Sequence, residues 1–315
     1  MILSGQLKGF LFILLADLLW GLSATAAKYL FSRQVSPFDL VQIRLILSFT
    51  LLAAYLLVFR PGLLKISRSD IPYMIFFGIF GVATVQFTYL FTISQTNVAT
   101  AVFLEYLAPV FILLYGLLFL GEKISPVRFL ALAGAITGGF LMVKGTTGSG
   151  MAVTVPGLIT GLASAVSFAF YTVYGKYGLS KYSPWTLLVW GMGVGGAAWA
   201  LYKAPWITFT SYGTAADWLF FFYIAIFATI LPFGFFFKGL NHLSPVVTGI
   251  TSTMEPVLAG ILSFLLLGEV LTIMQVTGCA LILSAVILLQ LRSKEQPEAQ
   301  AIAGEKAAGT ATTRQ

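Results

Sequence analysis

Long apolar runs are the feature that most constrains how this 315-residue chain can fold. A helix needs about 20 mostly apolar residues to cross a hydrocarbon core of about 30 Å, and short polar segments divide the chain into ten such stretches. They cover residues 7–31, 36–59, 71–93, 98–120, 126–144, 156–178, 184–203, 217–239, 245–267 and 272–292. Membrane-spanning strands would alternate in polarity, and these runs do not. We therefore predict an all-α membrane protein with ten transmembrane helices.

The composition agrees with a chain that sits in a bilayer. Hydrophobic residues make up 58% of the chain, charged residues 9%, and the mean hydropathy is +0.94, whereas soluble domains are about a quarter charged. The chain has one cysteine, Cys279, and one histidine, His242, so we expect no intrachain disulfide, no metal site and no Cys/His nucleophile. We expect no cofactor either. Residues 293–315 lack apolar periodicity and are predicted to form a disordered tail.

The formal net charge of +7 is a topology signal rather than a sign of a nucleic-acid partner. If the N-terminus is cytoplasmic, most Lys and Arg residues fall in cytoplasmic loops, and the opposite side keeps mainly Arg33, Lys144 and Lys203. This is the positive-inside bias of membrane proteins. It predicts a multi-pass protein of the cell membrane with both termini, and hence the tail, in the cytoplasm.

The chain contains an internal repeat, because a shift of 147 positions superimposes several motifs. The matched pairs are Ser36-Pro37 with Ser183-Pro184, Asp70 with Asp217, Pro109 with Pro256, and Gly121-Glu122 with Gly268-Glu269. Five spans per copy is an odd number, so the second copy crosses the membrane in the opposite sense. We therefore predict two inverted five-helix repeats, residues 1–146 and 147–292, with a binding site near the midplane.

Four charged residues inside the spans are candidates for transport or proton coupling: Asp17, Glu105, Glu255 and Arg44. A carboxylate at mid-membrane is costly unless it is protonated, paired or in contact with water, so it is a functional candidate by default. A second interpretation stays open, in which each glutamate pairs with Arg44 or with a backbone donor and only ties helices together.

Helical spacing groups small, polar and aromatic residues with these acids as candidates for lining a cavity. They are Trp20, Gly21, Ala24, Lys28, Gln86, Tyr89, Ala101, Phe168, Tyr171, Lys176, Thr248 and Ser252. Ordinary helix packing accounts for each of them about as well. Lys28 and Lys176 lie near span ends, where a long side chain can instead reach the membrane interface.

Two matched prolines, Pro109 and Pro256, each remove a helical hydrogen bond within a span. Such bends are tolerated where neighbouring helices or a cavity satisfy the freed carbonyl. The pair therefore predicts two related kinks as candidate gating elements.

Four segments together resemble the EamA family of the drug/metabolite transporter superfamily. They are "LLADLLWGLSATAAKY", "SPFDLVQIRLILS", "TAVFLEYLAPVFILLYGLLFLGEKIS" and "TSTMEPVLAGILSFLLLGEVLT", the last two each carrying a Pro followed twelve residues later by Gly-Glu. The resemblance implies a ten-helix carrier of the cytoplasmic membrane with both termini inside, usually moving small metabolites outward. Similar members include exporters of amino acids. Glu105 is a departure, because related stretches often have Gln there.

We therefore expect a secondary transporter that exports a small metabolite, an amino acid or drug-like compound, by alternating access, with proton exchange as candidate coupling. The expected partners are this substrate, the bilayer and protons, and the expected state is a monomer. One alternative is a transporter of phosphorylated sugars or nucleotides, which would need more inward Lys or Arg than the spans offer. Another is a membrane-embedded enzyme, but no nucleophile, metal or acid–base motif supports it, so we expect a non-enzyme.

Overall fold

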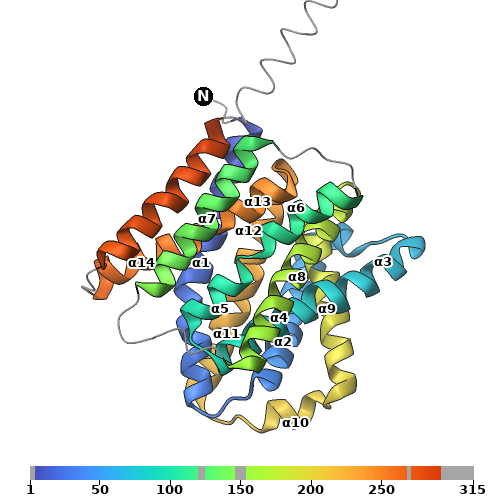
Figure 1. Cartoon of the computed structure of the whole chain (residues 1–315). Coiled ribbons are helices and arrows are strands. Elements are labelled where there is room, and N and C mark those ends of the chain that lie inside the picture. The colour runs from blue at the N-terminus through green and yellow to red at the C-terminus, as the bar shows by residue number, and fades with distance from the viewer. Residues whose placement is uncertain (1–3, 120–124, 146–153, 268–270, 292–315) are drawn as a thin grey trace, which may run out of the picture.

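The computed structural model describes residues 4–119, 125–145, 154–267 and 271–291, and within these ranges the chain forms helices and no strand (Figure 1). The prediction of an all-α protein is therefore confirmed. The two Gly-Glu pairs at 121–122 and 268–269 and the tail at 293–315 lie outside the described residues.

Nine helical segments in the described residues are long and apolar enough to cross a membrane. They are Gly5–Ser32, Pro37–Phe59, Arg68–Gln95, Val98–Phe119, Pro126–Lys144, Val155–Leu179, Ala215–His242, Pro245–Leu262 and Ile273–Leu291. The remaining predicted span forms the 19-residue helix α9 (Pro184–Tyr202), which is not among the nine. Gly191, Gly193, Gly195 and Gly196 reduce its apolarity. The predicted count of ten is thus not confirmed.

The helices of the two halves correspond in order. The first half holds α1 (Gly5–Ser32), α2 (Pro37–Phe59), η1 (Pro61–Leu64), η2 (Arg68–Asp70), α3 (Ile71–Phe76), η3 (Phe77–Ala83), α4 (Thr84–Gln95), α5 (Val98–Glu105), α6 (Ala108–Phe119) and α7 (Pro126–Lys144). The second holds α8 (Val155–Leu179), α9, α10 (Pro205–Thr210), α11 (Ala215–Ala225), η4 (Ile226–Ile230), α12 (Leu231–His242), α13 (Pro245–Ser252), α14 (Glu255–Leu267) and an unlabelled last helix, Ile273–Leu291.

Helix bounds repeat with the same offset as the sequence motifs. Adding 147 to the bounds of α4, α5 and α7 gives 231–242, 245–252 and 273–291, which are the bounds of α12, α13 and the last helix. The segments η3 and η4, which lead into α4 and α12, both have π-helical hydrogen bonding. Ser36 and Ser183 cap α2 and α9 by accepting a backbone N–H three residues on, and Pro follows each cap.

The end of α1 and the start of α8 meet at the same loop. Lys28, near the end of α1, donates to the carbonyls of Ile93 and Thr96 at 3.1 and 2.9 Å. Thr154, which caps the start of α8, donates to the carbonyl of Gln95 at 3.4 Å. The two helices therefore share this end while pointing in opposite directions.

The other ends of these helices meet at the matching loop of the second half. Lys176, near the end of α8, donates to the carbonyls of Leu240 and Leu243 at 2.7 and 3.0 Å. Gly9, near the start of α1, packs so closely on Leu243 that an added Cβ would lie 2.7 Å from its Cγ. Thus α1 and α8 are antiparallel. The C-terminal ends of α4 and α12, which they contact, lie at opposite ends of this helix pair.

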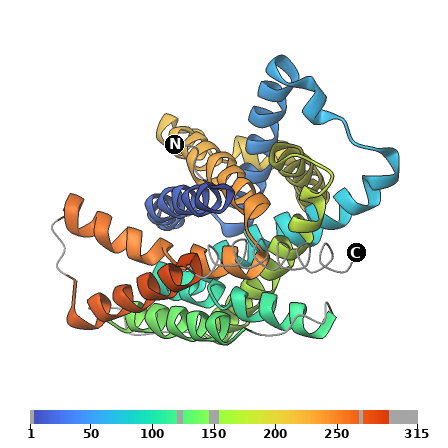
Figure 2. The same ribbon diagram turned by 90° about the horizontal axis from the view of Figure 1, so that it is seen from above.

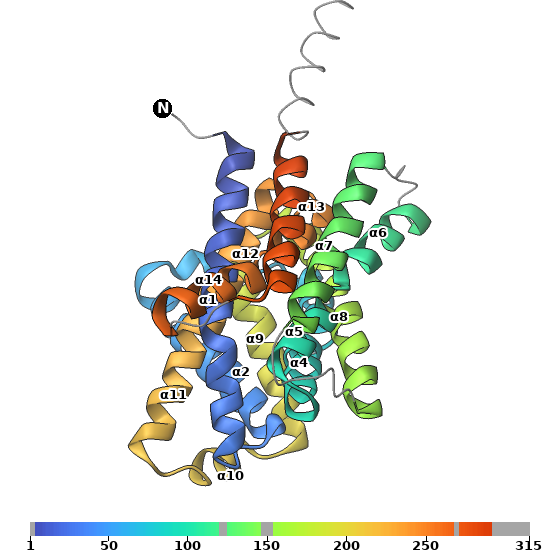
Figure 3. The ribbon, with the colours of Figure 1, turned by 60° about the vertical axis from the view of Figure 1, so that its left-hand side comes forward.

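The remaining helices complete a bundle in which the first and the last helix of the described chain have their outer ends on the same side. Figures 1 and 3 place the start of α1 and the end of the last helix at the same end of the molecule. Figure 2 shows α7 and the last helix side by side at one edge, where an added Cβ on Gly138 would lie 2.7 Å from the Gly278 carbonyl. Small residues allow this close backbone approach, as is common between membrane helices.

Candidate functional site

The helices that carry the two glutamates are each interrupted inside the bundle. The helix α5 ends at Glu105 before α6 begins, and α14 begins at Glu255 after α13 has ended (Figure 3). Pro109 and Pro256 are the second residues of α6 and α14, where the missing N–H of proline costs little. The prolines thus stand at helix interruptions rather than at smooth bends. Non-helical backbone at membrane depth is tolerated where it is buried in protein or lines a cavity.

A cavity lies beside these interruptions. Its charged lining residues are Arg44, Glu105 and Glu255, from α2, α5 and α14. It offers about 50 Å³ to the centres of water-sized molecules, several times the space that one ordered water requires. The structure therefore brings three of the four predicted charged residues around one cavity.

Aromatic side chains form much of the remaining lining. Of the predicted residues, Trp20, Gln86, Tyr89 and Phe168 line the cavity. The indole of Trp20 lies edge-on to Phe168, with ring centroids 6.3 Å apart. The site is thus a largely apolar pocket with a few polar groups, the usual composition of a small-molecule site.

Glu255 is held by a tyrosine that the sequence analysis did not select. The Tyr106 hydroxyl donates to Glu255 Oε2 at 2.5 Å, and both side chains are buried and line the cavity. Tyr106 is the residue that ends α5, directly after Glu105. Its position next to an intramembrane acid and a proline was the signal that could have identified it.

Glu105 is held by a hydroxyl from the second half. Ser164, a fully buried residue of α8, donates to Glu105 Oε2. Ser164 was not among the predicted residues either, because a serine in an apolar helix commonly bonds to its own backbone. Both cavity glutamates therefore accept hydrogen bonds from neutral hydroxyl groups.

Arg44 bonds to the π-helical segment η4 rather than to a glutamate. Its Nε donates to Thr229 Oγ1 and its Nη2 to the Ala228 carbonyl, both at 2.6 Å. Ala228 lies four residues before Pro232, which has no N–H to offer a carbonyl at that spacing. Arg44 thus donates to a carbonyl that Pro232 cannot reach with an N–H. Among the described residues no ion pair joins Arg44 to Glu105 or Glu255, so the predicted pairing of a glutamate with Arg44 is not found.

Asp17 is fully buried but does not line this cavity. Neither of its carboxylate oxygens has a hydrogen-bond partner among the described residues. It lies close enough to Glu255 for the two groups to interact electrostatically. An unpartnered buried charge is strongly unfavourable, so Asp17 requires a proton or a positive charge to compensate it.

Several other predicted lining residues pack between helices. Ala101 and Tyr171 are fully buried and do not line the cavity. The same holds for Thr248 and Ser252, whose hydroxyls have no partner among the described residues. Gly21 packs on α14, as its small size predicts, with an added Cβ 3.4 Å from the Cβ of Ala259.

Three more predicted residues do not reach the cavity or are not described. Lys28 and Lys176 use their ammonium groups to bond the last carbonyls of α4 and α12, an arrangement that stabilises helix C-termini. The side chain of Ala24 lies outside the described part of the chain.

Two related ion pairs lie at the helix ends, away from the cavity. Arg33, after α1, lies 3.1 Å from Asp217 at the start of α11, and Lys181, after α8, pairs with Asp70 at the start of α3. The aspartates are 147 residues apart and the basic residues 148 apart. Each pair joins one half to the other. The hydrogen bond to Asp70 raises the pKa of Lys181.

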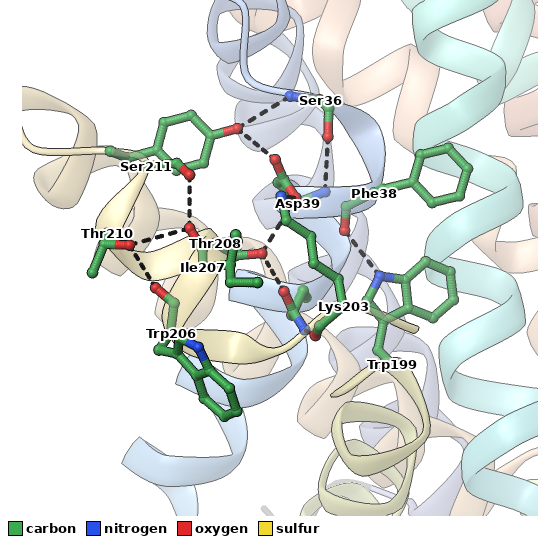
Figure 4. A network of polar contacts seen from close by, with 12 residues as sticks. Ser36, Phe38, Asp39, Trp199, Lys203, Trp206, Ile207, Thr208, Thr210 and Ser211 are labelled. Carbon is green, nitrogen blue, oxygen red and sulfur yellow. Dashed lines mark hydrogen bonds and ion pairs between the residues drawn. The ribbon is translucent and has the colours of Figure 1, made fainter. Parts of the chain in front are cut away.

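A separate polar network fixes the start of α2 to the segment around α10 (Figure 4). Lys203 lies 2.6 Å from Asp39, and Tyr212 and Thr208 donate to the same carboxylate at 2.9 and 3.3 Å. Burial, reinforced by the bond to Asp39, raises the pKa of Tyr212 to about 12. The repeat-related positions of Asp39 and Lys203 are Thr186 and Leu56, so the second half cannot form the same ion pair.

The sequence profile of the EamA-like transporter family matches residues 7–144 and, a second time, residues 155–291. The chain belongs to the EamA-like transporter family. It is 32% identical over 297 residues to the uncharacterized inner membrane transporter YicL of Salmonella typhimurium, covering 93% of this chain and 98% of that protein. It is 25% identical over 243 residues to the pseudopaline exporter CntI of Pseudomonas aeruginosa, covering 77% of this chain and 83% of the exporter.

A solved crystal structure shares the fold, with a TM-score of 0.74 and 21% sequence identity over 93% of this chain and 98% of that chain. Together with the apolar helices, the family assignment makes this chain a multi-pass membrane transporter. The resemblance drawn from the sequence is confirmed.

Proposed function

We propose that this transporter exports a small, amine-bearing metabolite, an amino acid or a drug-like compound, across the cytoplasmic membrane in exchange for protons. Glu105 and Glu255 are the groups that bind the amine or the proton. The observation that carries this proposal is their placement: two carboxylates at helix interruptions in an aromatic-lined cavity, each held by a hydroxyl and, in the part of the chain that the structure describes, by no ion pair.

The transport mechanism that we propose is alternating access between two inverted repeats, residues 1–146 and 147–292. Three observations support it: the family profile matches twice, the helix bounds repeat at an offset of 147, and α1 is antiparallel to α8. The positive-inside bias supports a cytoplasmic location for both termini. Interrupted helices at a repeat interface are where carriers of this architecture bind substrates and coupling ions.

The charge balance of the cavity favours a protonated amine. A buried carboxylate needs a compensating positive charge, and Arg44 brings one positive charge to a cavity lined by the two carboxylates of Glu105 and Glu255. A proton or an ammonium group can neutralise Glu105 or Glu255, but both cannot do so at the same oxygen. The proton and the ammonium group therefore compete for the same carboxylate, so binding of the amine favours release of the proton. This competition is the condition for exchange.

The lining favours an apolar or aromatic body attached to that amine. Trp20, Tyr89 and Phe168 offer ring faces and edges, and a cation close to a ring face gains about 0.5–2 kcal/mol. A phosphorylated substrate is disfavoured because phosphate requires several charged donors. The two repeat-related lysines, Lys28 and Lys176, are engaged at helix C-termini instead.

A panel of related probes in proteoliposomes tests the substrate class. Phenethylamine, phenylalanine and phenyl phosphate share a ring and differ in charge. With an imposed pH gradient, and after subtraction of the accumulation in liposomes free of protein, we expect accumulation of phenethylamine or phenylalanine and none of phenyl phosphate. Accumulation of phenyl phosphate alone would refute the proposal. If phenylalanine moves and phenethylamine does not, the site takes the amino acid rather than the simple amine.

A further inference from the structure

Each cavity glutamate is held by a hydroxyl from the opposite half of the chain. Ser164, on α8 of the second half, donates to Glu105 of the first. Tyr106, at the end of α5 in the first half, donates to Glu255 of the second at 2.5 Å. The two bonds thus cross between the halves in both directions, at the two helix interruptions.

Both bonds lie at the centre of the molecule, and neither has a counterpart at the repeat-related positions. The repeat-related position of Tyr106 is Thr253, whose hydroxyl donates to the Ile250 carbonyl of its own helix at 2.7 Å. Ser164 corresponds to Ala16 in the 148-residue register that relates Lys28 to Lys176, and alanine has no donor. Duplication alone therefore does not explain either hydroxyl.

We propose that Tyr106 and Ser164 are positioning residues that make the movement of the two halves depend on what occupies the glutamates. The proposal rests on the proposed function of Glu105 and Glu255. A hydroxyl bonds to an ionised carboxylate about twice as strongly as to a neutral acceptor. The links between the halves are therefore strongest when both glutamates are empty and ionised, and weaker once a proton or an ammonium group neutralises them.

This dependence suppresses uncoupled transport. An exchanger must rearrange when it is loaded and stay in place when it is empty, because movement of the empty carrier would dissipate the gradient. Hydrogen bonds between the halves that become stronger when the proton or the amine leaves the glutamates meet that requirement. Other charged or titratable groups act on these carboxylates from the packed helices, namely Asp17 from α1, Arg44 from α2 and Tyr89 from α4. None of the three forms a hydrogen bond to either glutamate among the described residues.

The experiment measures uncoupled movement directly with Tyr106→Phe and Ser164→Ala in proteoliposomes. Phenethylamine is loaded inside, the outside contains no amine, and a pH-sensitive dye records proton entry while the amine leaves, with liposomes free of protein as the correction for passive amine permeation. Amine efflux in excess of proton entry is efflux without exchange, and it is compared with exchange against external phenethylamine. We expect efflux without exchange to rise about tenfold in either variant, since each loses one hydrogen bond to a charged group. The ratio of efflux without exchange to exchange should therefore rise in both variants, and Ser164→Thr, which keeps a donor, should show the low ratio of the parent.

Tyr171→Phe is the matched control, because the Tyr171 hydroxyl is also buried, has no partner among the described residues and does not line the cavity. Unchanged efflux in folded Tyr106→Phe and Ser164→Ala carriers would overturn the inference, and so would a rise in Tyr171→Phe of the same size. If Tyr106→Phe does not fold, the Ser164→Ala and Ser164→Thr pair decides the question alone. Loss of exchange in Glu105→Gln and Glu255→Gln, with normal efflux in both hydroxyl variants, would refute this inference and leave the proposed function standing.

Discussion

The two halves of the molecule share two sets of contacts at their ends and differ at their centre. At the ends, Lys28 and Lys176 bond to equivalent loops, and the pairs Arg33–Asp217 and Lys181–Asp70 join equivalent helices. These contacts maintain the shape that both halves share, so duplication preserves them.

At the centre the charged residues have no charged counterpart. Shifting by 147 places Gly191 opposite Arg44, Ser252 opposite Glu105, and Ala108 opposite Glu255. The architecture is therefore duplicated while the chemistry of the cavity is not. A substrate has one orientation in the site, and residues that contact it need not obey the symmetry of the helices around it.

Removing the central charges gives the largest expected effect. Glu105→Gln and Glu255→Gln should each reduce proton-coupled transport about 10- to 100-fold, because each removes a buried site for a proton or an amine. Ser252→Ala, at the position related to Glu105, should leave the rate nearly unchanged, since its hydroxyl has no partner among the described residues. Initial rates in proteoliposomes measure both. An equal loss in Ser252→Ala would show that the two halves contribute alike.

Loss of the hydrogen bond from Arg44 to η4 should lower the unfolding free energy of the protein. Arg44→Ala leaves the buried Ala228 carbonyl without this donor and should cost about 1–3 kcal/mol of unfolding free energy. Pro232→Ala restores an N–H near that carbonyl and should recover part of the loss. A double-mutant cycle on detergent-solubilised protein measures the coupling, expected at about 1 kcal/mol. Strict additivity would mean that Arg44 acts elsewhere.

Removing either of the two ion pairs at the helix ends should have a smaller effect, and the two removals should act in opposite directions. Exposed pairs contribute about 0–1 kcal/mol, so Asp70→Asn and Asp217→Asn should each shift the balance between open states by a few-fold. The readout is labelling of a cysteine at Ala27, which lines the cavity, by an impermeant maleimide in a Cys279→Ser background. The two variants should change labelling from one side in opposite directions. Changes in the same direction would break the equivalence of the two ends.

Much of the fold was predictable because it follows from local chemistry. Apolar length sets the spans, and the repeat at 147 and the two prolines locate related helix interruptions. The count of ten was less secure, because the glycine-rich helix α9 is not among the nine helices that are long and apolar enough to cross a membrane in the described residues. The glutamates and Arg44 were found because charge inside a span is rare.

The hydrogen bonds of the site were not predictable from the pattern. Which way Tyr106 points depends on the backbone where α5 ends, and no periodicity encodes that geometry. Arg44 bonds to the Ala228 carbonyl in a π-helical segment four residues before Pro232, and the sequence shows only the proline. Ser164 looks like any small residue of a packed helix until Glu105 lies beside it.

The central claim is that Glu105 and Glu255 bind an amine or a proton in turn, and simultaneous recording of both movements tests it most directly. Phenethylamine is added outside proteoliposomes that hold a pH-sensitive dye and no imposed gradient, with liposomes free of protein as the correction for passive amine permeation. We predict carrier-dependent proton movement opposite to the amine, lost in the Glu105→Gln and Glu255→Gln carriers. Carrier-dependent amine movement without any proton movement would contradict the account.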